Sequence, residues 1–261
     1  TRLVGSEMCI RDRSKSSFFT TILLLLPAMA SAQTADDDLQ LELRYYAPKL
    51  KFTSSGIVPA AYSNFRDTLN IKNGNAPEYK LSGKNWYVDY IAIHEKGYAS
   101  HHIPAQGSLI PADSRTKLNL DYASFNYLSP IKTTENGTAY WLAGLRCYRF
   151  DTALQFSSPV LNKKCAKQLN QFAPAFGIGG KHYLDEAHRL QLYSELYSEL
   201  SGLPLGGRGH TYDLDIGVKY SPCKNLSANA GYRVLDLKIK NDDGTGLYKL
   251  SGWYGGLSYS F

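Results

Sequence analysis

The chain has 261 residues, a formal net charge of +6 and an aromatic content of 13%, with 20 Tyr and 22 Gly. The basic excess is mild and is spread along the chain without a Lys/Arg block, which argues against nucleic-acid binding. No segment beyond residue 32 is apolar enough for a transmembrane helix, and no linker or low-complexity tract divides the chain. We therefore expect one large domain, and the Tyr and Gly content favours a β-protein with aromatic belts.

The N-terminal region has the pattern of an export signal. Three basic residues precede an apolar run at 18–29, and the small-residue triplet Ala30-Ser31-Ala32 follows it. This order predicts a cleaved signal peptide, and the run is shorter than the roughly 20 residues that a membrane-spanning helix needs. We interpret residues 1–13 as a non-native extension. The predicted organisation is this extension plus the signal peptide over 1–32 and an outer-membrane β-barrel over 33–261.

The last ten residues alternate in character with a period of two. Trp253, Gly255, Leu257, Tyr259 and Phe261 fall on one face, and the other face carries Ser, Gly and a single Tyr. Successive side chains of a β-strand point to opposite faces, so one face of this strand is large and apolar. A barrel strand that faces lipid on one side and a wet lumen on the other requires this alternation.

The same alternation marks paired strands along the rest of the chain, most clearly over 212–220 and 226–234. Beyond Val234 the apolar phase shifts by one residue, which predicts either a β-bulge or an exit from the membrane. Placing Phe261 at a periplasmic end sets the direction of every earlier strand and puts longer connections outside, at 54–66, 99–114, 155–169 and 202–209. Ten strands are predicted, at 39–53, 67–81, 84–98, 115–130, 138–154, 170–184, 187–201, 209–222, 225–240 and 247–261.

These strands predict an all-β fold, a closed antiparallel up-and-down transmembrane β-barrel of ten strands. Counts of eight or twelve are the alternatives, because two segments are ambiguous. Residues 67–81 contain Pro77 and an Asn-Gly-Asn sequence, which suit a strand poorly, and residues 185–203 could also form an amphipathic helix. A soluble β-sandwich or a lipocalin-like barrel, with its apolar face inside, is the remaining competitor.

Aromatic residues near the predicted periplasmic ends suit an interfacial girdle. The strand directions come from the turns alone, so these aromatic positions test them independently. The predicted girdle consists of Trp86, Tyr87, Tyr140, Trp141, Tyr220 and Tyr259.

Charged residues on the face opposite the apolar one are expected to line the interior, because an Arg or Lys facing lipid at mid-membrane costs about 2–4 kcal/mol. Both signs occur, so two interpretations are open: paired charges that fill a narrow barrel, and a polar conduit for small solutes. A ten-strand barrel is smaller than the open porins of about 16 to 18 strands, which argues against a large pore. The predicted lumen charge network is Glu42, Arg44, Asp89, Asp121, Arg146, Arg189, Glu195, Asp213, Asp215, Lys219 and Arg233.

An outer-membrane enzyme, either a protease or a lipid A or lipid hydrolase, is the alternative function. Its His/Asp site would lie at the extracellular rim, where the strand directions place His101, His102, His210, Asp242 and Asp243. No local motif around these residues is diagnostic, so we expect a structural or narrow porin-like barrel without catalysis. The sequence has no calcium-loop pattern and no zinc-ligand spacing, and we expect neither a cofactor nor a metal.

Three cysteines follow the leader: Cys147, Cys165 and Cys223. An odd number in an exported protein defines no disulfide framework. Free thiols are the favoured interpretation, and a Cys147–Cys165 pair is the alternative.

The leader, paired strands such as YDLDIGVKYSPCKNLSANAGYRVLDLKI and the ending GWYGGLSYSF resemble small bacterial outer-membrane β-barrel proteins of the OmpA/OmpW-like or opacity-protein-like group. The resemblance is strongest over 209–261. It implies a monomeric barrel in contact with outer-membrane lipid and lipopolysaccharide. It also implies insertion by the barrel-assembly machinery, which would recognise Trp253, Leu257, Tyr259 and Phe261. It transfers no activity, because the group covers structural anchors, adhesins and narrow channels.

Overall fold

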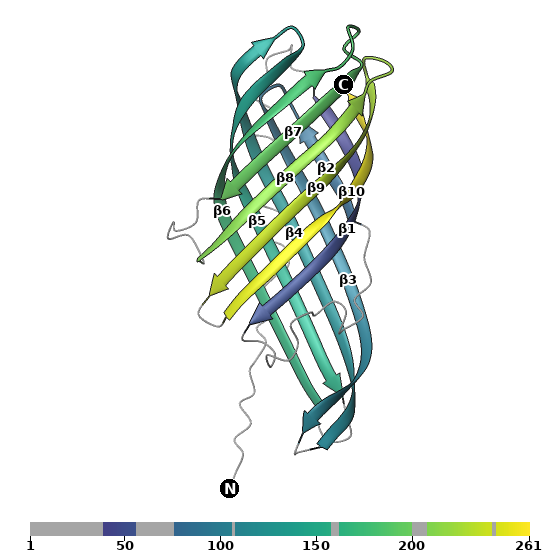
Figure 1. Ribbon diagram of the computed structural model, residues 1–261, viewed down its shortest axis with the longest axis vertical. Helices are drawn as coiled ribbons and strands as arrows, with labels where there is room; N and C mark the ends of the chain where they lie inside the picture. The colour runs from purple at the N-terminus through teal and green to yellow at the C-terminus, as the bar shows by residue number, and fades with distance from the viewer. Residues whose placement is uncertain (1–38, 56–75, 106–107, 158–161, 200–207, 242–243) are drawn as a thin grey trace. The chain divides into compact units, whose positions relative to one another are not determined.

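In a computed structural model, the chain forms ten β-strands that close into one antiparallel barrel (Figure 1). The structure describes residues 39–55, 76–105, 108–157, 162–199, 208–241 and 244–261. The extension and signal peptide predicted over 1–32 lie outside these residues. The strands are β1 (Gln40–Ser55), β2 (Ala76–Ser82), β3 (Trp86–Ala105), β4 (Ser108–Thr134), β5 (Gly137–Ser157), β6 (Asn162–Tyr183), β7 (Leu190–Glu199), β8 (Arg208–Tyr220), β9 (Leu226–Asn241) and β10 (Gly244–Ser260).

The barrel closes through β1 and β10, whose register runs from Gln40 opposite Ser260 to Ser55 opposite Thr245. Every other neighbouring pair is consecutive in sequence and antiparallel, so none of the described strands forms the free edge of an open sheet. The predicted all-β, up-and-down barrel of ten strands is confirmed, and the alternative counts of eight and twelve are wrong. The described part of the chain contains no helix long and apolar enough to cross a membrane.

Short turns gather at one end of the barrel, where the C-terminus also lies (Figure 1). They connect β2 to β3, β4 to β5, β6 to β7 and β8 to β9. The N–H of Phe261 donates to the carbonyl oxygen of Leu39 at 2.9 Å, which joins the last strand to the first. We call the end of the barrel that carries these short turns and the C-terminus the turn end. At the opposite end, the far end, the connections fall outside the described residues, at 56–75, 106–107, 158–161, 200–207 and 242–243.

Strands β3 to β6 are longer than the sequence indicated, with 20, 27, 21 and 22 residues. The predicted loops at 99–114 and 155–169 are therefore wrong over most of their length, because these four strands continue through them. A strand does not have to end where it leaves a membrane, since the hydrogen-bonded ladder continues as long as its partner continues. Figure 1 shows β3 to β6 extending toward the far end beyond the other strands.

Both ambiguous segments form strands. β2 begins at Ala76 and carries Pro77 opposite Tyr45 of β1, while residues 67–75 lie outside the described part. β7 pairs with β6 on one side and β8 on the other, so the helical alternative for 185–203 is wrong. The sequence of this segment fits both a helical and a strand periodicity, and pairing with a neighbouring strand on each side stabilises the strand.

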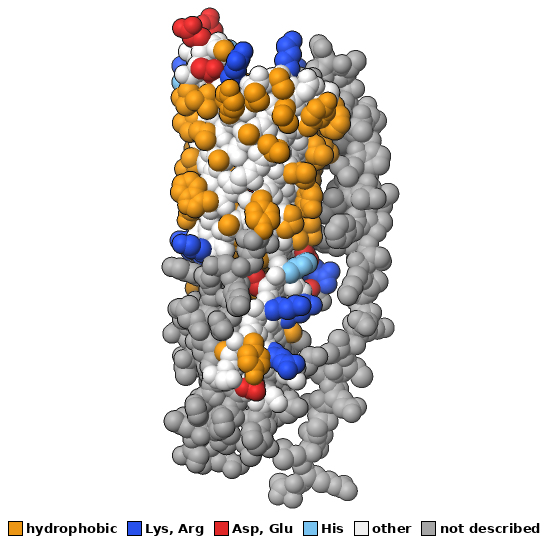
Figure 2. Space-filling view, turned by 90° about the vertical axis from the view of Figure 1, so that its right-hand side faces the viewer, with side chains coloured by type: hydrophobic (Ala, Val, Ile, Leu, Met, Phe, Trp, Pro, Cys, Tyr) orange, Lys and Arg blue, Asp and Glu red, His pale blue; other side chains and the backbone are white. Residues whose placement is uncertain are grey.

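Large apolar side chains form a band around the outside of the barrel near the turn end (Figure 2). Ile216, Val218 and Leu257 are 45%, 40% and 60% exposed, so the apolar face of the strands points outward. The lipocalin-like alternative is wrong, because it requires this face to be inside. We call this surface the apolar band, and its exposed members include Leu43, Tyr45, Trp141, Phe176, Ile178, Leu192, Leu196, Ile216, Val218, Trp253 and Leu257.

The predicted aromatic girdle is only partly correct. Trp141, Tyr220 and Tyr259 are exposed on the outer wall. Tyr87 and Tyr140 are 5% and 6% exposed, and their side chains are buried in the interior. Each of these two tyrosines is adjacent in sequence to a tryptophan, so neighbouring positions must point to opposite faces of the barrel wall.

Toward the far end of the barrel, the apolar residues of the strands change from the outward face to the inward face. Leu235 and Leu237 of β9 are 2% and 0% exposed, while Asp236 and Lys238 occupy the alternate, more exposed positions. The register of β9 with β8 and β10 runs through this region without a break. The phase shift after Val234 is therefore the exit from the apolar band, not a β-bulge. Where water wets the outer wall, apolar side chains are more stable inside.

The inward apolar side chains of this region form one buried cluster, which we call the apolar layer. The rings of Phe150 and Tyr248 stack within it at a centroid distance of 4.1 Å. Seven strands contribute to the layer, so it packs across the interior rather than along one wall. Its members are Tyr46, Ala76, Ile91, Ile93, Leu118, Leu120, Tyr122, Tyr148, Phe150, Leu235, Leu237, Tyr248, Leu250 and Tyr254.

Candidate functional site

Charged side chains fill the interior on the turn-end side of the apolar layer. Asp89 comes before Ile91 on β3, and Arg233 comes before Leu235 on β9, in each case nearer the turn end. Eight predicted members of the lumen charge network are buried here, with 1–7% of their surface exposed: Glu42, Arg44, Asp89, Arg146, Glu195, Asp213, Asp215 and Arg233.

Arg233 on β9 lies at the centre of three carboxylates. Its guanidinium donates to both oxygens of Asp213, at 2.9 and 2.7 Å. It also donates to Glu78 Oε1 at 2.8 Å and to Asp89 Oδ2 at 3.2 Å. The planar fork of arginine suits such multiple contacts. Because the three acids belong to β8, β2 and β3, this one side chain connects strands from separate parts of the wall.

Arg44 on β1 organises a second set of acids. It donates to Asp215 Oδ2 at 2.8 Å and pairs with Glu42 on its own strand. Its Nη1 also lies 3.4 Å from Glu78 Oε1, so Glu78 is shared by the two arginines. The guanidinium carbon lies 4.6 Å from the ring centroid of Tyr254, within the range of a cation–π contact.

Two tyrosines connect this ion network to the apolar layer. Tyr122 and Tyr254 belong to the layer through their rings. Tyr122 donates its hydroxyl hydrogen to Asp213 Oδ2 at 3.0 Å, and Tyr254 donates to Asp215. Each ring therefore packs among apolar side chains while its hydroxyl satisfies a buried carboxylate, as buried tyrosines require.

Glu195 on β7 forms a separate cluster nearer the turn end. It accepts hydrogen bonds from the hydroxyls of Tyr87 and Tyr140, at 2.6 and 2.9 Å. Lys80 Nζ lies 3.9 Å from Glu195 and 3.8 Å from the ring centroid of Tyr87. Of the four tyrosines predicted for the girdle, Tyr87 and Tyr140 are inside, where their hydroxyls satisfy this carboxylate.

A polar relay joins the two clusters. Arg146 on β5 donates to Asn126 Oδ1 at 2.6 Å and lies over the Tyr197 ring at 4.3 Å. Asn126 donates to Ser124 Oγ at 2.8 Å, and Ser124 donates in turn to Asp89. The interior is thus a connected network in which charges are paired or hydrogen-bonded, as buried ions must be.

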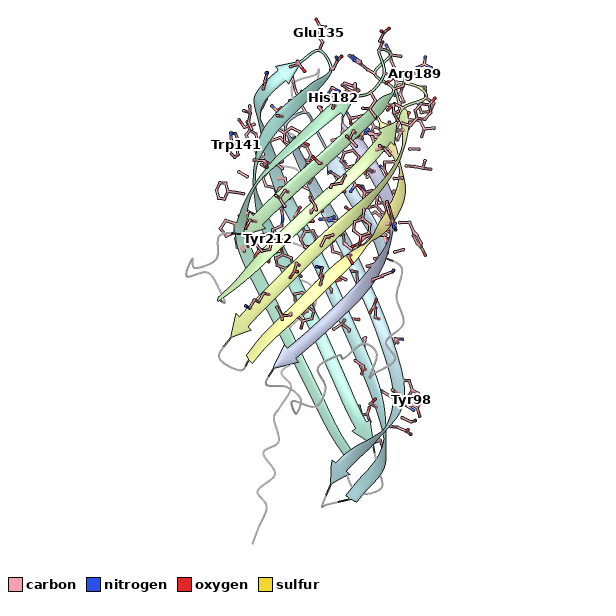
Figure 3. The ribbon with its side chains drawn as sticks, in the orientation of Figure 1. Tyr98, Glu135, Trp141, His182, Arg189 and Tyr212 are labelled. Atoms are coloured by element: carbon pink, nitrogen blue, oxygen red, sulfur yellow. The ribbon has the colours of Figure 1, made fainter. Side chains whose placement is uncertain are left out.

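Three predicted members of the network are not among these eight, although one of them, Lys219, does face the interior. Lys219 is half-buried near the turn end and donates to Gln40 Oε1 at 2.8 Å. The prediction is wrong for Asp121, whose two chain neighbours on β4 are 3% and 0% exposed and therefore occupy the inward face. It is also wrong for Arg189, which is exposed in the β6–β7 turn (Figure 3).

Sequence reasoning missed Glu78 and Lys80. Their signal was present, because Ala76, Glu78 and Lys80 alternate with Pro77 and Tyr79 over β2. The proline made the segment ambiguous, so its charges were not assigned to a face. Several inward tyrosines were missed for another reason: tyrosine suits both a membrane interface and a buried polar network.

The residues proposed for a catalytic rim are not described at the level of side chains. The backbone of His101 and His102 lies in β3, and that of His210 lies in β8. Asp242, Asp243 and the three histidine side chains lie outside the described set. Strands β3 and β8 are five strands apart in either direction around the barrel, so the backbone of His210 lies on the opposite wall from that of His101 and His102.

The cysteines do not form the alternative disulfide. In the β5–β6 ladder Cys165 lies opposite Leu154, while Cys147 lies opposite Phe172. The Cys147–Phe172 and Leu154–Cys165 pairs are far apart along the two strands. A disulfide requires Cα atoms within about 7 Å of each other. Cys147 and Cys223 are both free thiols.

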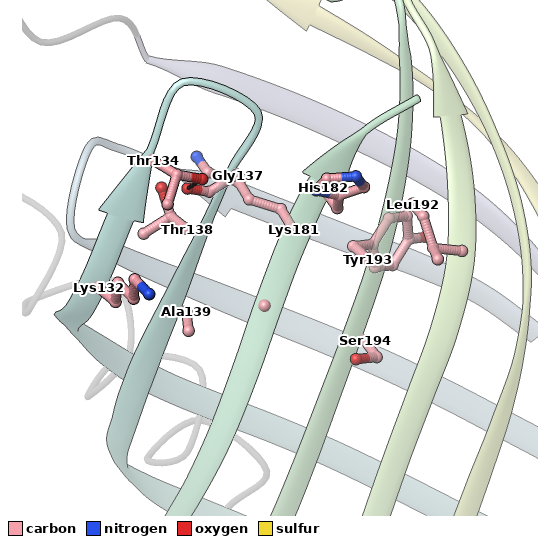
Figure 4. Close-up of a pocket in the computed structure, with 11 residues that line it drawn as sticks. Lys132, Thr134, Gly137, Thr138, Ala139, Lys181, His182, Leu192, Tyr193 and Ser194 are labelled. Atoms are coloured by element: carbon pink, nitrogen blue, oxygen red, sulfur yellow. Dashed lines mark hydrogen bonds between the residues drawn. The ribbon is translucent and has the colours of Figure 1, made fainter. Parts of the chain in front are cut away.

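A hollow of about 400 Å³ lies on the wall near the turn end (Figure 4). Its floor is one register row of small residues, Ala139 opposite Gly180 and Gly180 opposite Ser194. Ala139 is exposed, which places the hollow on the outer surface rather than in the interior. Lys132 and His182 are among its lining residues. The hollow is a shallow depression in the outer surface of the apolar band. Its polar lining residues lie on the side of the turn end.

The closed barrel, the outward apolar band and the charged interior together define the class of protein: an outer-membrane-type β-barrel. No protein-family model matches the chain, and no curated protein matches it in sequence. Among solved structures it is similar to the outer membrane protease OmpT from Escherichia coli, with 11% identity, a TM-score of 0.50, and coverage of 88% of this chain and 98% of that one.

Two further solved structures are similar with lower scores. The translocator domain of the autotransporter NalP from Neisseria meningitidis has 11% identity and a TM-score of 0.41, covering 92% of this chain and 95% of that one. The attachment invasion locus protein Ail of Yersinia pestis has 13% identity and a TM-score of 0.33, covering 85% and 98%. At these identities, the comparison with OmpT supports the fold alone.

Proposed function

We propose that this protein is a structural barrel of the bacterial outer membrane, with a lumen that does not conduct solutes and without catalytic activity. The apolar band supports membrane residence, because exposed side chains such as Trp141, Ile216 and Leu257 are stabilised by contact with acyl chains. The signal-peptide pattern supports export across the inner membrane.

The filled interior carries the proposal of a closed lumen. Ion pairs around Arg44 and Arg233 occupy the turn-end side, and the apolar layer adjoins them toward the far end. A conduit for solutes needs a continuous wet path lined by polar groups. Here a solute would have to separate buried ion pairs and then cross side chains that are at most 7% exposed. Both steps are costly in an interior of low dielectric constant.

Single-channel recording tests the closed lumen. Purified protein, refolded and inserted into planar bilayers, is expected to give no stepwise conductance, while a known porin in the same apparatus does. Uniform openings would overturn the proposal if their ion selectivity changed in a Lys219→Glu variant. Lys219 is half-buried at the turn end of the interior, so its charge would face any permeating ion. Openings that also appeared with a mock preparation lacking the protein would come from a contaminant and leave the proposal standing.

The absence of catalysis has its own test. Folded protein is incubated with a peptide library and with lipopolysaccharide, next to a His101→Ala/His102→Ala/His210→Ala variant. We expect no turnover by either protein. Turnover by the wild type that the triple variant lost would overturn this part and establish the enzyme alternative.

We also propose that the barrel-assembly machinery inserts the chain as a monomer through its last strand. Trp253, Leu257, Tyr259 and Phe261 are 71%, 60%, 48% and 68% exposed on the outer wall, so they are accessible before the barrel meets lipid. Deletion of Phe261 is expected to lower the amount of heat-modifiable barrel in the outer-membrane fraction. An unchanged amount would contradict the role of this ending.

A further inference from the structure

Two lysines face each other on the outer wall beyond the apolar band. Lys96 of β3 lies directly opposite Lys117 of β4, and both are exposed. The next outward pair is Tyr98 opposite Arg115, with Tyr98 51% exposed. Like charges directly opposite each other in an antiparallel pair are destabilising. The sheet thus holds a local electrostatic cost that a bound anion would remove.

The hydrogen bonds and ion pairs of the acidic side chains on the same face are made with groups other than Lys96, Lys117 and Arg115. Asp113 accepts a hydrogen bond from Ser100 at 2.7 Å. Asp121 lies 3.2 Å from the hydroxyl of Tyr90 and 3.6 Å from His94 Nε2.

The third acid, Asp151, pairs with Arg149 at 3.2 Å. Among the residues that the structure describes, no ion pair neutralises Lys96, Lys117 or Arg115. These three residues form a cluster of positive charges without a direct ion pair among the described residues, which we call the basic patch.

The patch begins where the apolar band ends. The outward positions of β3 change from Val88, Tyr90 and Ala92 to His94 and Lys96 along the direction of the far end. Tyr98 lies well away from the turn end that Glu135 and Arg189 mark in Figure 3. Figure 2 shows basic side chains beyond the orange band on this side. A lipid with its acyl chains against the band would therefore place its head group beside the patch.

We propose that the basic patch binds the phosphate groups of a phosphorylated glycolipid of the lipopolysaccharide class, in the leaflet on the far side of the band from Phe261. The lipid's acyl chains lie along the apolar band, and its phosphates accept charge-assisted hydrogen bonds from Lys96, Lys117 and Arg115. Binding neutralises the opposed lysines. This inference rests on the membrane residence in the proposed function, but not on the closed lumen or on the absence of catalysis.

Native mass spectrometry of the folded barrel in neutral detergent tests the patch. The probes are bisphosphorylated lipid A, its dephosphorylated form, phosphatidylglycerol and inorganic phosphate. We expect lipid A to bind most tightly, and a Lys96→Gln/Lys117→Gln variant to bind it about tenfold more weakly. A Lys96→Arg/Lys117→Arg variant keeps the charge and is expected to retain binding.

The matched control is Arg189→Gln/Lys224→Gln, which removes two exposed charges at the turn end and is expected to leave binding unchanged. The proposal is overturned if the Gln pair at 96 and 117 binds lipid A as the wild type does, or if the dephosphorylated lipid binds equally well. Equal loss in the control variant would also overturn it, because net charge and not the patch would then be responsible. Tighter binding of phosphatidylglycerol than of lipid A would assign the patch to a phospholipid instead and reject the glycolipid.

One measurement separates a fold defect from a binding defect. The Lys96→Gln/Lys117→Gln variant is expected to melt at the same temperature as the wild type or higher in phosphatidylcholine, because the like-charge pair is gone. Conductance by the wild type would overturn the closed lumen and leave this inference intact. Failure of the wild type to insert into bilayers would overturn both.

Discussion

The guanidinium of Arg233 and the carboxylate of Asp213 form a two-point contact in the barrel interior, at 2.9 and 2.7 Å, between the adjacent strands β9 and β8. The same arginine reaches Glu78 and Asp89 across the lumen. One side chain therefore neutralises carboxylates from several strands. The network depends on it more than on any single acid.

Removal of this arginine is the strongest expected perturbation. Arg233→Met leaves three buried carboxylates without their main cation, and we expect the free energy of unfolding to fall by about 3–5 kcal/mol. Urea titration in detergent micelles, followed by heat-modifiable gel mobility, measures it. The control Arg149→Gln removes a partly exposed arginine that pairs with Asp151, and should cost less than about 1 kcal/mol. Equal effects would contradict a central role for Arg233.

The outer wall is apolar in the band and polar beyond it. We therefore expect a charged substitution to be costly within the band and tolerated beyond it. Ile216→Arg places a cation in the apolar band and is expected to cost about 2–4 kcal/mol in a bilayer. Asn119→Arg, on the outer wall of β4 beyond the band, should cost less than about 0.5 kcal/mol, since that position meets water. Refolding into phosphatidylcholine vesicles with urea titration compares them. A similar cost at both positions would mean that the band does not end where we place it.

Gly217 of β8 makes room for two tyrosines. A Cβ atom there would lie 2.5 Å from the Tyr193 hydroxyl oxygen and 2.8 Å from that of Tyr254. We expect Gly217→Ala to lower the free energy of unfolding by about 1–3 kcal/mol, because both rings must move. The same substitution in a Tyr193→Leu/Tyr254→Phe background should cost less, as the groups that it meets are gone. A cost that stays the same in both backgrounds would assign the effect to the backbone.

The β6–β7 turn is expected to depend on pH. The backbone N–H of Leu190 donates to Asp185 at 2.7 Å and that of Arg189 donates at 3.1 Å. These hydrogen bonds, with the one from Leu190 first, lower the pKa of Asp185 below its ordinary 3.8. The stabilisation is therefore complete above that ordinary pKa and is lost as the pH falls through the depressed one.

The amide resonance of Leu190 reports this transition in NMR spectra of the barrel in micelles. It should titrate below pH 3.8 in the wild type and remain flat in Asp185→Asn, which keeps an acceptor without a titrating group. A midpoint above the ordinary value would show that the carboxylate is not held by the two amides.

The clearest strands could be recognised from alternation alone, because a wall between lipid and a polar lumen demands a period of two at every position. Leu214, Ile216 and Val218 are examples, and so is the C-terminal strand. The residues around 99–114 were misread, because charged and polar residues mark loops in a membrane barrel but also mark a strand that continues into water. Asp121 was assigned to the lumen for the same reason: beyond the band a charged outward residue is no longer costly.

By itself, the sequence determined the antiparallel barrel and the direction in which its apolar face points, since both follow from the local order of apolar and polar side chains. Only the tertiary structure decided which charges meet. The partners of Arg233 lie 20, 144 and 155 positions away in the chain, so their proximity depends on barrel closure and strand stagger. The position of the apolar layer also depends on barrel closure and strand stagger, because the layer forms where inward residues from seven strands reach the same depth.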